Sequence, residues 1–329
     1  MMGLQVDDKK VLLNVDQLKQ YFPIKGGIFG RTVNHVKAVD DISFHIYEGE
    51  TLSIVGESGC GKSTTGRAIL RLDEPTSGSI HFQDKDLLSL RKNEMRKIRK
   101  DLQVIFQDPF ASLNPRQTIG QILGEALAIQ NVVPKEDRKA RIEELLGHVG
   151  LRPEAMDRYP HEFSGGQRQR VGIARALAVD PKLIICDEAV SALDVSIQAQ
   201  VLNLLKSLQR KFSLTFLFIS HDLGVVRHIS DRVMVMYLGK IVEIADKKSI
   251  FENPQHPYTR ALLSAIPVPN PMQTRERILL TGDVPSPIDP PSGCRFHTRC
   301  PFALDICKTK IPDLKISEQN HQVACHIVV

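Results

Sequence analysis

The most constraining feature of the sequence is a glycine-rich loop that reads Gly-Glu-Ser-Gly-Cys-Gly-Lys-Ser-Thr from Gly56 to Thr64. It matches the pattern G-x-x-x-x-G-K-[ST] and follows an apolar run at 52–55 that is typical of a buried strand. A helix is expected after it, at 64–72. A strand, such a loop and a helix gather backbone N–H groups at the positive end of the helix. The sequence therefore predicts a nucleoside triphosphate site here, rather than a glycine-rich turn that binds nothing.

The residue types in this loop suit a triphosphate. The glycines allow the backbone to approach an anion, Lys62 can reach the β- and γ-phosphates, and the Ser63 hydroxyl can ligate Mg²⁺. The predicted nucleotide-contacting set is Gly56, Glu57, Ser58, Gly59, Cys60, Gly61, Lys62, Ser63 and Thr64.

A second feature is the apolar run at 183–186, which ends in Asp187 and Glu188. A buried parallel strand carries its C-terminal residues to the ligand crevice of a sheet. At that position Asp187 can hold Mg²⁺ and Glu188 can polarise an attacking water. The alternative is an incidental acidic end of a strand.

Two polar residues follow other predicted strands, and each is weak evidence alone. Gln107 follows the strand at 102–106, where it could sense a ligand or simply be a surface glutamine. His221 follows the strand at 214–219, where it could hydrogen-bond a γ-phosphate or be structural.

Two further stretches could contact a nucleotide. Ser164-Gly165-Gly166-Gln167 precedes an apolar helix at 171–179, which predicts a second anion site at a helix N-terminus. Tyr21 or Phe22 could stack on a base, although packing into the core is equally plausible.

The remaining pattern predicts an α/β protein. Helical periodicity at 116–158 predicts a helical insertion. Short strands are expected before the phosphate loop, with an exposed excursion at 26–31 and a hairpin across 238–240 near the end. The expected short strands are 11–13, 36–39 and 42–46.

Composition narrows the function classes. No apolar stretch approaches the ~18–20 residues of a membrane helix, and residues 1–10 lack the apolar region of a secretory signal. We therefore expect a cytoplasmic chain that reaches a membrane through partners. With a net charge of +5, interleaved charges and no Trp, nothing points to nucleic acid.

Taken together, these stretches resemble the ATP-binding subunits of ABC transporters, because the landmarks occur in that family's order. They are Walker A at 56–63, the Q-loop at Gln107, the signature at 164–167, Walker B at 183–187, the D-loop from Ser191 to Asp194, and the switch at His221. Phe163 stands where the signature commonly begins with Leu, and an apolar replacement should not matter.

The resemblance implies a P-loop NTPase fold with an antiparallel β subdomain and a helical subdomain inserted at about 108–165. It also implies a head-to-tail dimer that holds two ATP. Lys62, Gln107, Glu188 and His221 would then be catalytic, and Ser63, Gln107 and Asp187 would arrange Mg²⁺. Tyr21 is the candidate for the base contact, with Phe22 as the open alternative. The partner's site would be completed by Ser164, Gly165, Gly166, Gln167 and Asp194.

The C-terminal part narrows the resemblance further. The stretch His256-Pro-Tyr-Thr-Arg260 and the four cysteines Cys294, Cys300, Cys307 and Cys325 resemble the oligopeptide/dipeptide importer ATPases. The long excursion at 21–39 is similar to that of the F-type member of their paired D and F subunits. We expect an ABC ATPase domain at 1–250 and a proline- and cysteine-rich extension at 251–329.

The four cysteines lack a CxxC pair, so their spacing indicates a soft metal without separating zinc from iron–sulfur, and free thiols are the alternative. The resemblance favours a structural [4Fe–4S] cluster, because some members of this family carry one in the tail.

The resemblance also implies the partners and the location. They are a second, D-type ATPase subunit, two transmembrane permeases and an external peptide-binding protein, with this chain on the cytoplasmic face of the cell membrane. The alternatives are the same motor serving nickel or another small solute, a soluble ABC ATPase acting on DNA or ribosomes, and an ATP-binding scaffold without turnover.

Overall fold

The computed structural model describes residues 9–26, 30–108, 112–266, 277–318 and 320–328, and the chain divides into two units. The first unit contains Met1–Val11, Ile46–Thr51 and Ser89–Ile219, and the second contains Leu12–His45, Leu52–Leu88 and Ser220–Val329. These units do not follow the expected boundary after residue 250, which stays a prediction.

The first unit carries the parallel strands β6 (Leu102–Ile105), β7 (Leu183–Asp187) and β8 (Thr215–Ile219). Leu102 pairs with Leu183 and Asp187 pairs with Ile219, so the three strands end at the same edge. All residues of β8 are buried, as expected for a central strand whose side chains are almost all apolar. The predicted strands at 102–106, 183–187 and 214–219 are thus confirmed to within one residue.

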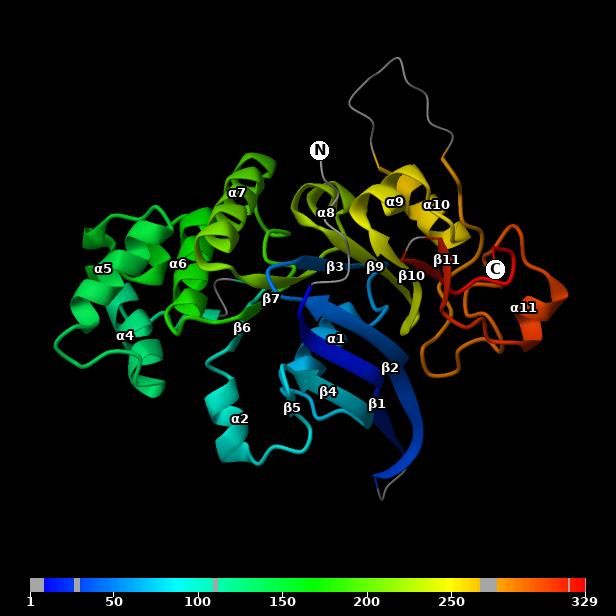
Figure 1. The fold of residues 1–329 in the computed structure, drawn as a ribbon, viewed down its shortest axis with the longest axis horizontal. Helices are drawn as coiled ribbons and strands as arrows, with labels where there is room; N and C mark the ends of the chain where they lie inside the picture. Colours follow the sequence, from blue (N-terminus) through cyan, green and yellow to red (C-terminus); the bar gives the residue numbers. More distant parts are fainter. Residues whose placement is uncertain (1–8, 27–29, 109–111, 267–276, 319, 329) are drawn as a thin grey trace, which may run out of the picture. The chain divides into compact units, whose positions relative to one another are not determined.

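Four helices of the first unit, α4 to α7, lie together on one side of these strands (Figure 1). α4 (Ile119–Ile129) and α5 (Arg138–His148) contact each other and α6 (Gly165–Leu177), which also contacts β6 and α7 (Val195–Phe212). Apolar residues at helical spacing, such as Ile119, Ile122 and Leu123 in α4, face the interior. The described part of this unit also contains α2 (Lys92–Ile98) and the short 3-10 helices η2 (Pro153–Asp157) and η3 (Pro160–Glu162).

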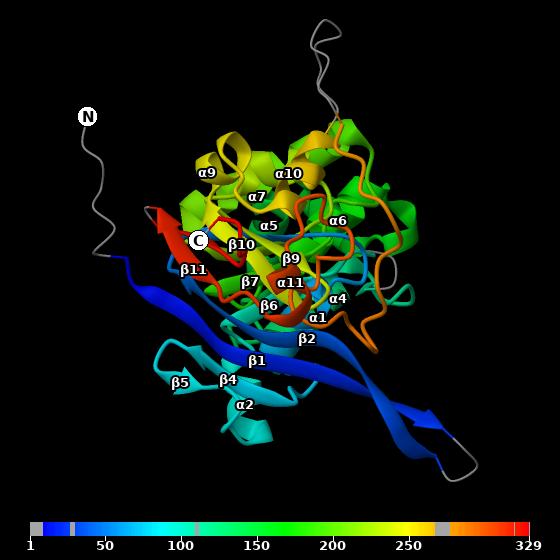
Figure 2. The same ribbon diagram turned by 90° about the vertical axis from the view of Figure 1, so that its right-hand side faces the viewer.

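In the second unit, two long strands replace the three short ones predicted near the N-terminus. β1 (Val11–Gly26) and β2 (Arg31–Tyr47) run side by side (Figure 2), with β4 (Ser77–Phe82) and β5 (Lys85–Asp86) next in the sheet. Asp41 has φ +61°, so β2 passes through a local irregularity between its two apolar runs without ending. The expected excursion at 26–31 lies partly outside the described residues.

The second sheet region of this unit contains β3 (Thr51–Val55), β9 (Arg232–Tyr237), β10 (Lys240–Asp246), β12 (His321–Val323) and β11 (Lys315–Glu318), in that order. β3 pairs with β9 in parallel, and β9 and β10 form the predicted hairpin. β12 adds the end of the chain to β10 by antiparallel pairing, with Val323 opposite Glu243.

The helices of this unit are α1 (Lys62–Ile69), α8 (Leu223–Ile229), α9 (Lys247–Glu252), α10 (Pro257–Ser264) and α11 (Asp305–Thr309). The core joins the hairpin to α8, α9 and α10, and it includes Phe296 from the C-terminal part of the chain. Among the described residues, no helix combines the length and apolar character that a membrane crossing requires.

Candidate nucleotide-binding site

The phosphate loop joins β3 to α1 in the second unit, as the sequence predicted. Its turn depends on glycine, because Gly61 has φ +102° and a Cβ there would lie 2.2 Å from the carbonyl oxygen of Ala38. At Gly56, which has φ +152°, an added Cβ would likewise lie 2.2 Å from the carbonyl oxygen of Met236. Two neighbouring strands therefore press against the loop and set its shape.

Lys62 lies inside this loop and is 5% exposed. Its Nζ donates to the carbonyl oxygens of Gly56 and Glu57, at 2.9 Å each. The ammonium group is therefore held within the loop, where it suits a phosphate. Ser63 and Thr64 belong to the first turn of α1. The rim of the loop is formed by Glu57, which is half-buried, and by Ser58 and Gly59, which are exposed.

Cys60 is the buried member of the loop, and burial raises the pKa of its thiol. Its carbonyl oxygen accepts a hydrogen bond from the Gly239 amide at 3.0 Å. Cys60 thus ties the loop to the turn of the β9–β10 hairpin, and its thiol stays protonated at neutral pH.

His221 belongs to the same unit and follows β8 at the start of α8. The preceding Ser220 amide donates to the carbonyl oxygen of Ile54, two residues before the loop, at 3.1 Å. Asp222 caps α8 by accepting from the Gly224 amide at 2.7 Å. The backbone at His221 is therefore anchored next to the strand that feeds the phosphate loop, while its imidazole is exposed.

Of the two aromatic candidates, Tyr21 is the one that the fold holds in place. Its hydroxyl donates to Asp40, and burial followed by this hydrogen bond raises its pKa. Phe22 is 36% exposed. Tyr21 and Phe22 both belong to the unit that contains the phosphate loop, so which of them meets a base stays a prediction.

The first unit brings Gln107 and Glu188 together, although 81 residues separate them. Nε2 of Gln107 donates to Oε2 of Glu188 at 2.9 Å, because parallel β6 and β7 end at one edge. Glu188 has φ +49°, a strained conformation for a residue with a Cβ, and its amide donates to the carbonyl oxygen of Ile219 at 3.0 Å. Asp187 is the last residue of β7, directly before it.

The signature stretch forms the N-terminus of α6 in the same unit. Ser164 is the N-cap: its hydroxyl accepts from the Gln167 amide at 3.4 Å, and Gln167 Oε1 accepts from the Ser164 amide at 3.0 Å. A Cβ on Gly166 would lie 2.4 Å from Ile197 of α7, so the close packing there requires glycine. Asp194 is the N-cap residue of α7.

The predicted residues thus fall into two groups. The phosphate loop, Tyr21 and His221 belong to the second unit, while Gln107, Asp187, Glu188, the signature and Asp194 belong to the first.

The four C-terminal cysteines lie near one another. Burial, together with the proximity of Cys307, Cys325 and Cys300, raises the pKa of Cys294 to about 11. Backbone amides hydrogen-bond to Cys294, Cys300 and Cys325, as amides do around thiolate ligands. Among the described residues, however, no group of three or more His, Cys, Asp or Glu side chains is placed to hold a metal ion. The expected metal or cluster is therefore not confirmed.

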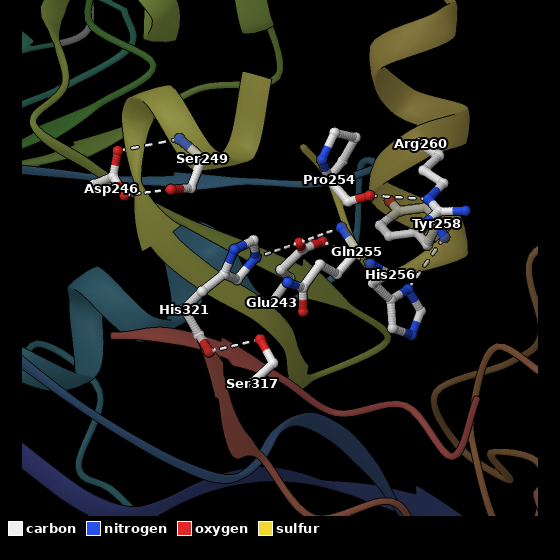
Figure 3. A network of polar contacts seen from close by, with 10 residues as sticks. All are labelled: Glu243, Asp246, Ser249, Pro254, Gln255, His256, Tyr258, Arg260, Ser317 and His321. Carbon is white, nitrogen blue, oxygen red and sulfur yellow. Dashed lines mark hydrogen bonds and ion pairs between the residues drawn. The ribbon is translucent and has the colours of Figure 1, made fainter. Parts of the chain in front are cut away.

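The His-Pro-Tyr-Thr-Arg stretch is organised by a buried carboxylate on β10 (Figure 3). Glu243 accepts from the amides of Gln255 and His256, at 2.7 and 3.0 Å, and pairs with His321 of β12 at 2.6 Å. His256 in turn caps α10 by accepting from the Tyr258 amide at 3.1 Å. One carboxylate thus joins the hairpin, α10 and the end of the chain.

Sequence reasoning did not identify the residues of the C-terminal part of the chain that contact the phosphate loop. Arg299 pairs with Glu57 at 2.8 Å, and the Tyr258 hydroxyl accepts from the Glu57 amide at 2.9 Å. Arg295 likewise pairs with Asp40. Each arginine stands next to a cysteine in the sequence, but no local pattern indicates a partner more than 200 residues away.

Comparisons with known proteins agree with this geometry. The family model described as ABC transporter matches residues 39–191, and the model described as oligopeptide/dipeptide transporter, C-terminal region, matches residues 242–307.

Two curated relatives are similar over nearly the whole chain. The oligopeptide transport ATP-binding protein AppF of Bacillus subtilis is 57% identical over 323 residues, which cover 97% of this chain and 98% of that protein. The oligopeptide transport ATP-binding protein OppF of Salmonella typhimurium is 53% identical over 329 residues, which cover 98% of each.

Among solved structures, cbiO1 of Clostridium perfringens, part of the ABC transporter complex cbiONQ, has a TM-score of 0.64 at 27% identity, covering 74% of this chain and 92% of that one. An ATP-binding cassette dimer in a post-hydrolysis state with ADP and Pi has a TM-score of 0.63 at 30% identity, covering 71% and 98%.

Proposed function

This chain belongs to the ATP-binding proteins of oligopeptide ABC transporters, and from that membership we propose that it hydrolyses ATP to drive peptide import through a membrane transporter. The observation that carries the proposal is the pairing of Glu188 with Gln107 in a chain that also has the phosphate loop around Lys62. A carboxylate and an amide at the ends of adjacent parallel strands suit the positioning of water and Mg²⁺.

The proposed division of roles follows from the chemistry of each side chain. Lys62 and the loop amides would hold the phosphates, and Ser63, Gln107 and Asp187 would arrange Mg²⁺, which neutralises charge on the phosphates. Glu188 would act on the attacking water and His221 would contact the γ-phosphate.

The dimer supplies the remaining contacts in this proposal. Ser164, Gly165, Gly166, Gln167 and Asp194 would complete the ATP site of a second, D-type subunit, which would return the same contacts. Closure would then depend on ATP, because a helix N-terminus from each subunit meets the other's nucleotide. We further propose two permeases and an external peptide-binding protein as partners, with this chain at the cytoplasmic face of the membrane.

The test is uptake of labelled di- and oligopeptides, with nickel measured alongside, in cells whose only copy of this chain carries Lys62→Ala. We expect loss of peptide uptake with nickel uptake intact. Loss of nickel uptake alone would assign a different cargo to the same motor, and no loss of either in cells without a redundant importer would refute the transport role.

Glu188→Gln in the purified transporter separates a motor from an ATP-binding scaffold. A motor should lose nearly all hydrolysis while its closed dimer accumulates with ATP. A scaffold would show no change in either quantity.

For the cysteine group we propose a [4Fe–4S] cluster, with Zn²⁺ as the alternative. The support is that the four cysteines influence one another electrostatically and that backbone amides donate to three of them. Either group would staple a segment rich in proline. Anaerobic purification followed by iron, zinc and acid-labile sulfide analysis decides between them, and protein without iron or zinc would refute both.

A further inference from the structure

Residues 294–300, called here the cysteine loop, have a fixed place in the second unit. Phe296 is 1% exposed and its ring packs against Tyr237, Tyr258 and His256, with centroids at 5.2, 5.3 and 5.7 Å. The Cys294 amide donates to the carbonyl oxygen of Cys307 at 2.8 Å. The buried Phe296 ring therefore fixes the position of the loop that carries Arg295 and Arg299.

Arg299 points from this loop to the phosphate loop. Its guanidinium donates to both carboxylate oxygens of Glu57, at 2.8 and 3.3 Å. The Arg299 side chain is 9% exposed and that of Glu57 is 27% exposed. A bidentate ion pair that is mostly shielded from water fixes the orientation of the Glu57 carboxylate as well as its distance from Arg299.

The backbone of the same residue is held independently. The Glu57 amide donates to the Tyr258 hydroxyl at 2.9 Å, and Tyr258 is fully buried against Phe296. The C-terminal part of the chain thus holds Glu57 of the phosphate loop at two points, its carboxylate through Arg299 and its amide through Tyr258.

Arg295, the second arginine of the cysteine loop, is connected to Tyr21 through Asp40. It pairs with Asp40 and donates to the carbonyl oxygen of Leu238, and Asp40 accepts from the Tyr21 hydroxyl. The neighbouring Gly239 accepts from the Asp40 amide at 2.9 Å and donates to the carbonyl oxygen of Cys60 at 3.0 Å.

We propose that the cysteine loop positions the nucleotide site, with Arg299 holding the phosphate loop through Glu57 and Arg295 holding Tyr21 through Asp40. This inference rests on the proposed binding of ATP by the phosphate loop. A phosphate loop that is already held in its binding conformation loses less conformational freedom when ATP binds. The contacts of Arg299 and Arg295 therefore raise the affinity for ATP. The two arginines hold the phosphate loop and Tyr21 rather than the groups proposed to act on water, so we expect them to act on the KM for ATP and to leave kcat nearly unchanged.

The test is titration of the full-length chain with Mg-ATP, followed by steady-state ATP hydrolysis in the assembled transporter. We expect Arg299→Ala to weaken ATP binding about tenfold. Arg299→Lys should recover part of that loss, because lysine restores the positive charge without the bidentate hydrogen bonding of a guanidinium. Adding Glu57→Gln to Arg299→Ala should cause little further loss, since the two act as one pair. KM should rise with kcat within about twofold.

Lys308→Ala is the matched control, because Lys308 forms an ion pair with Asp305 in the same region but both side chains are exposed, at 61% and 98%. It should bind ATP like the wild type. Glu57→Gln serves as the second variant if Arg299→Ala does not fold, since it leaves the buried arginine in place.

The outcomes separate this inference from the proposed function. Wild-type chain that binds no ATP, or Lys62→Ala that binds as well as wild type, would refute the ATP site itself. A functional ATP site with Arg299→Ala and Glu57→Gln both within twofold of wild type would refute the positioning role alone. A fall in kcat at unchanged KM would also refute it.

Discussion

Removing the buried carboxylate of Glu243 should release α10 from the rest of the second unit. Glu243 has no exposed surface and accepts from the amides of Gln255 and His256 and from His321. In Glu243→Ala these donors lose their partner in a buried site. Each buried donor left unpaired costs about 1–3 kcal/mol, so we expect the local free energy of opening to fall by about 3 kcal/mol after partial relaxation.

The assay is hydrogen exchange of the segment that contains Gln255 and His256, because it reports opening of this region alone. A loss of about 3 kcal/mol corresponds to exchange on the order of 100-fold faster. Glu252→Ala, an exposed glutamate at the end of α9, is the matched control and should leave the rate unchanged. Glu243→Gln should lie between the two, since its amide oxygen still accepts one bond.

The pH dependence provides a second readout. Burial opposes ionisation of Glu243, but hydrogen bonds from His321 and the two amides outweigh it and lower its pKa below the ordinary 4.5. A carboxyl group with a depressed pKa stabilises the fold above its unfolded pKa and loses that contribution as pH falls through the folded value. The difference in melting temperature between wild type and Glu243→Gln should therefore shrink below pH ~4.5. Equal exchange rates in wild type and Glu243→Ala would refute the reasoning.

Three further predictions concern the phosphate loop, two buried cysteines and the buried ring of Phe296. Gly61→Ala should reduce ATP binding at least about tenfold in an equilibrium titration, because its Cβ would meet the Ala38 carbonyl at 2.2 Å; unchanged affinity would show that β2 yields easily. Cys60 and Cys186, which are 4% and 0% exposed and whose thiol pKa values burial raises, should react with maleimide only after unfolding, as measured by mass spectrometry; rapid labelling of the native chain would contradict this. Phe296→Ala should lower the melting temperature, since losing a buried ring costs about 3–5 kcal/mol; a change within about one degree would mean that the ring adds nothing to the core.

Local sequence determined the elements whose chemistry lies within a few residues. The phosphate loop needs glycines, a lysine and a hydroxyl at fixed spacing between a strand and a helix, and the structure has that order. The run before Asp187 is apolar because β7 is buried between β6 and β8, so its carboxyl end could be predicted as well. The order of the landmarks then led from these local patterns to the family.

Tertiary structure decided the rest, because the partners are far apart in the sequence. β1 and β2 are longer than their apolar runs, since pairing with neighbouring strands carries them through irregular positions such as Asp41. Gln107 meets Glu188 only because parallel strands end together. The contact of Arg299 with Glu57 spans 242 residues. In the sequence Arg299 cannot be told from an exposed cation, because its position depends on the chain folding back and on the packing of the buried Phe296 ring.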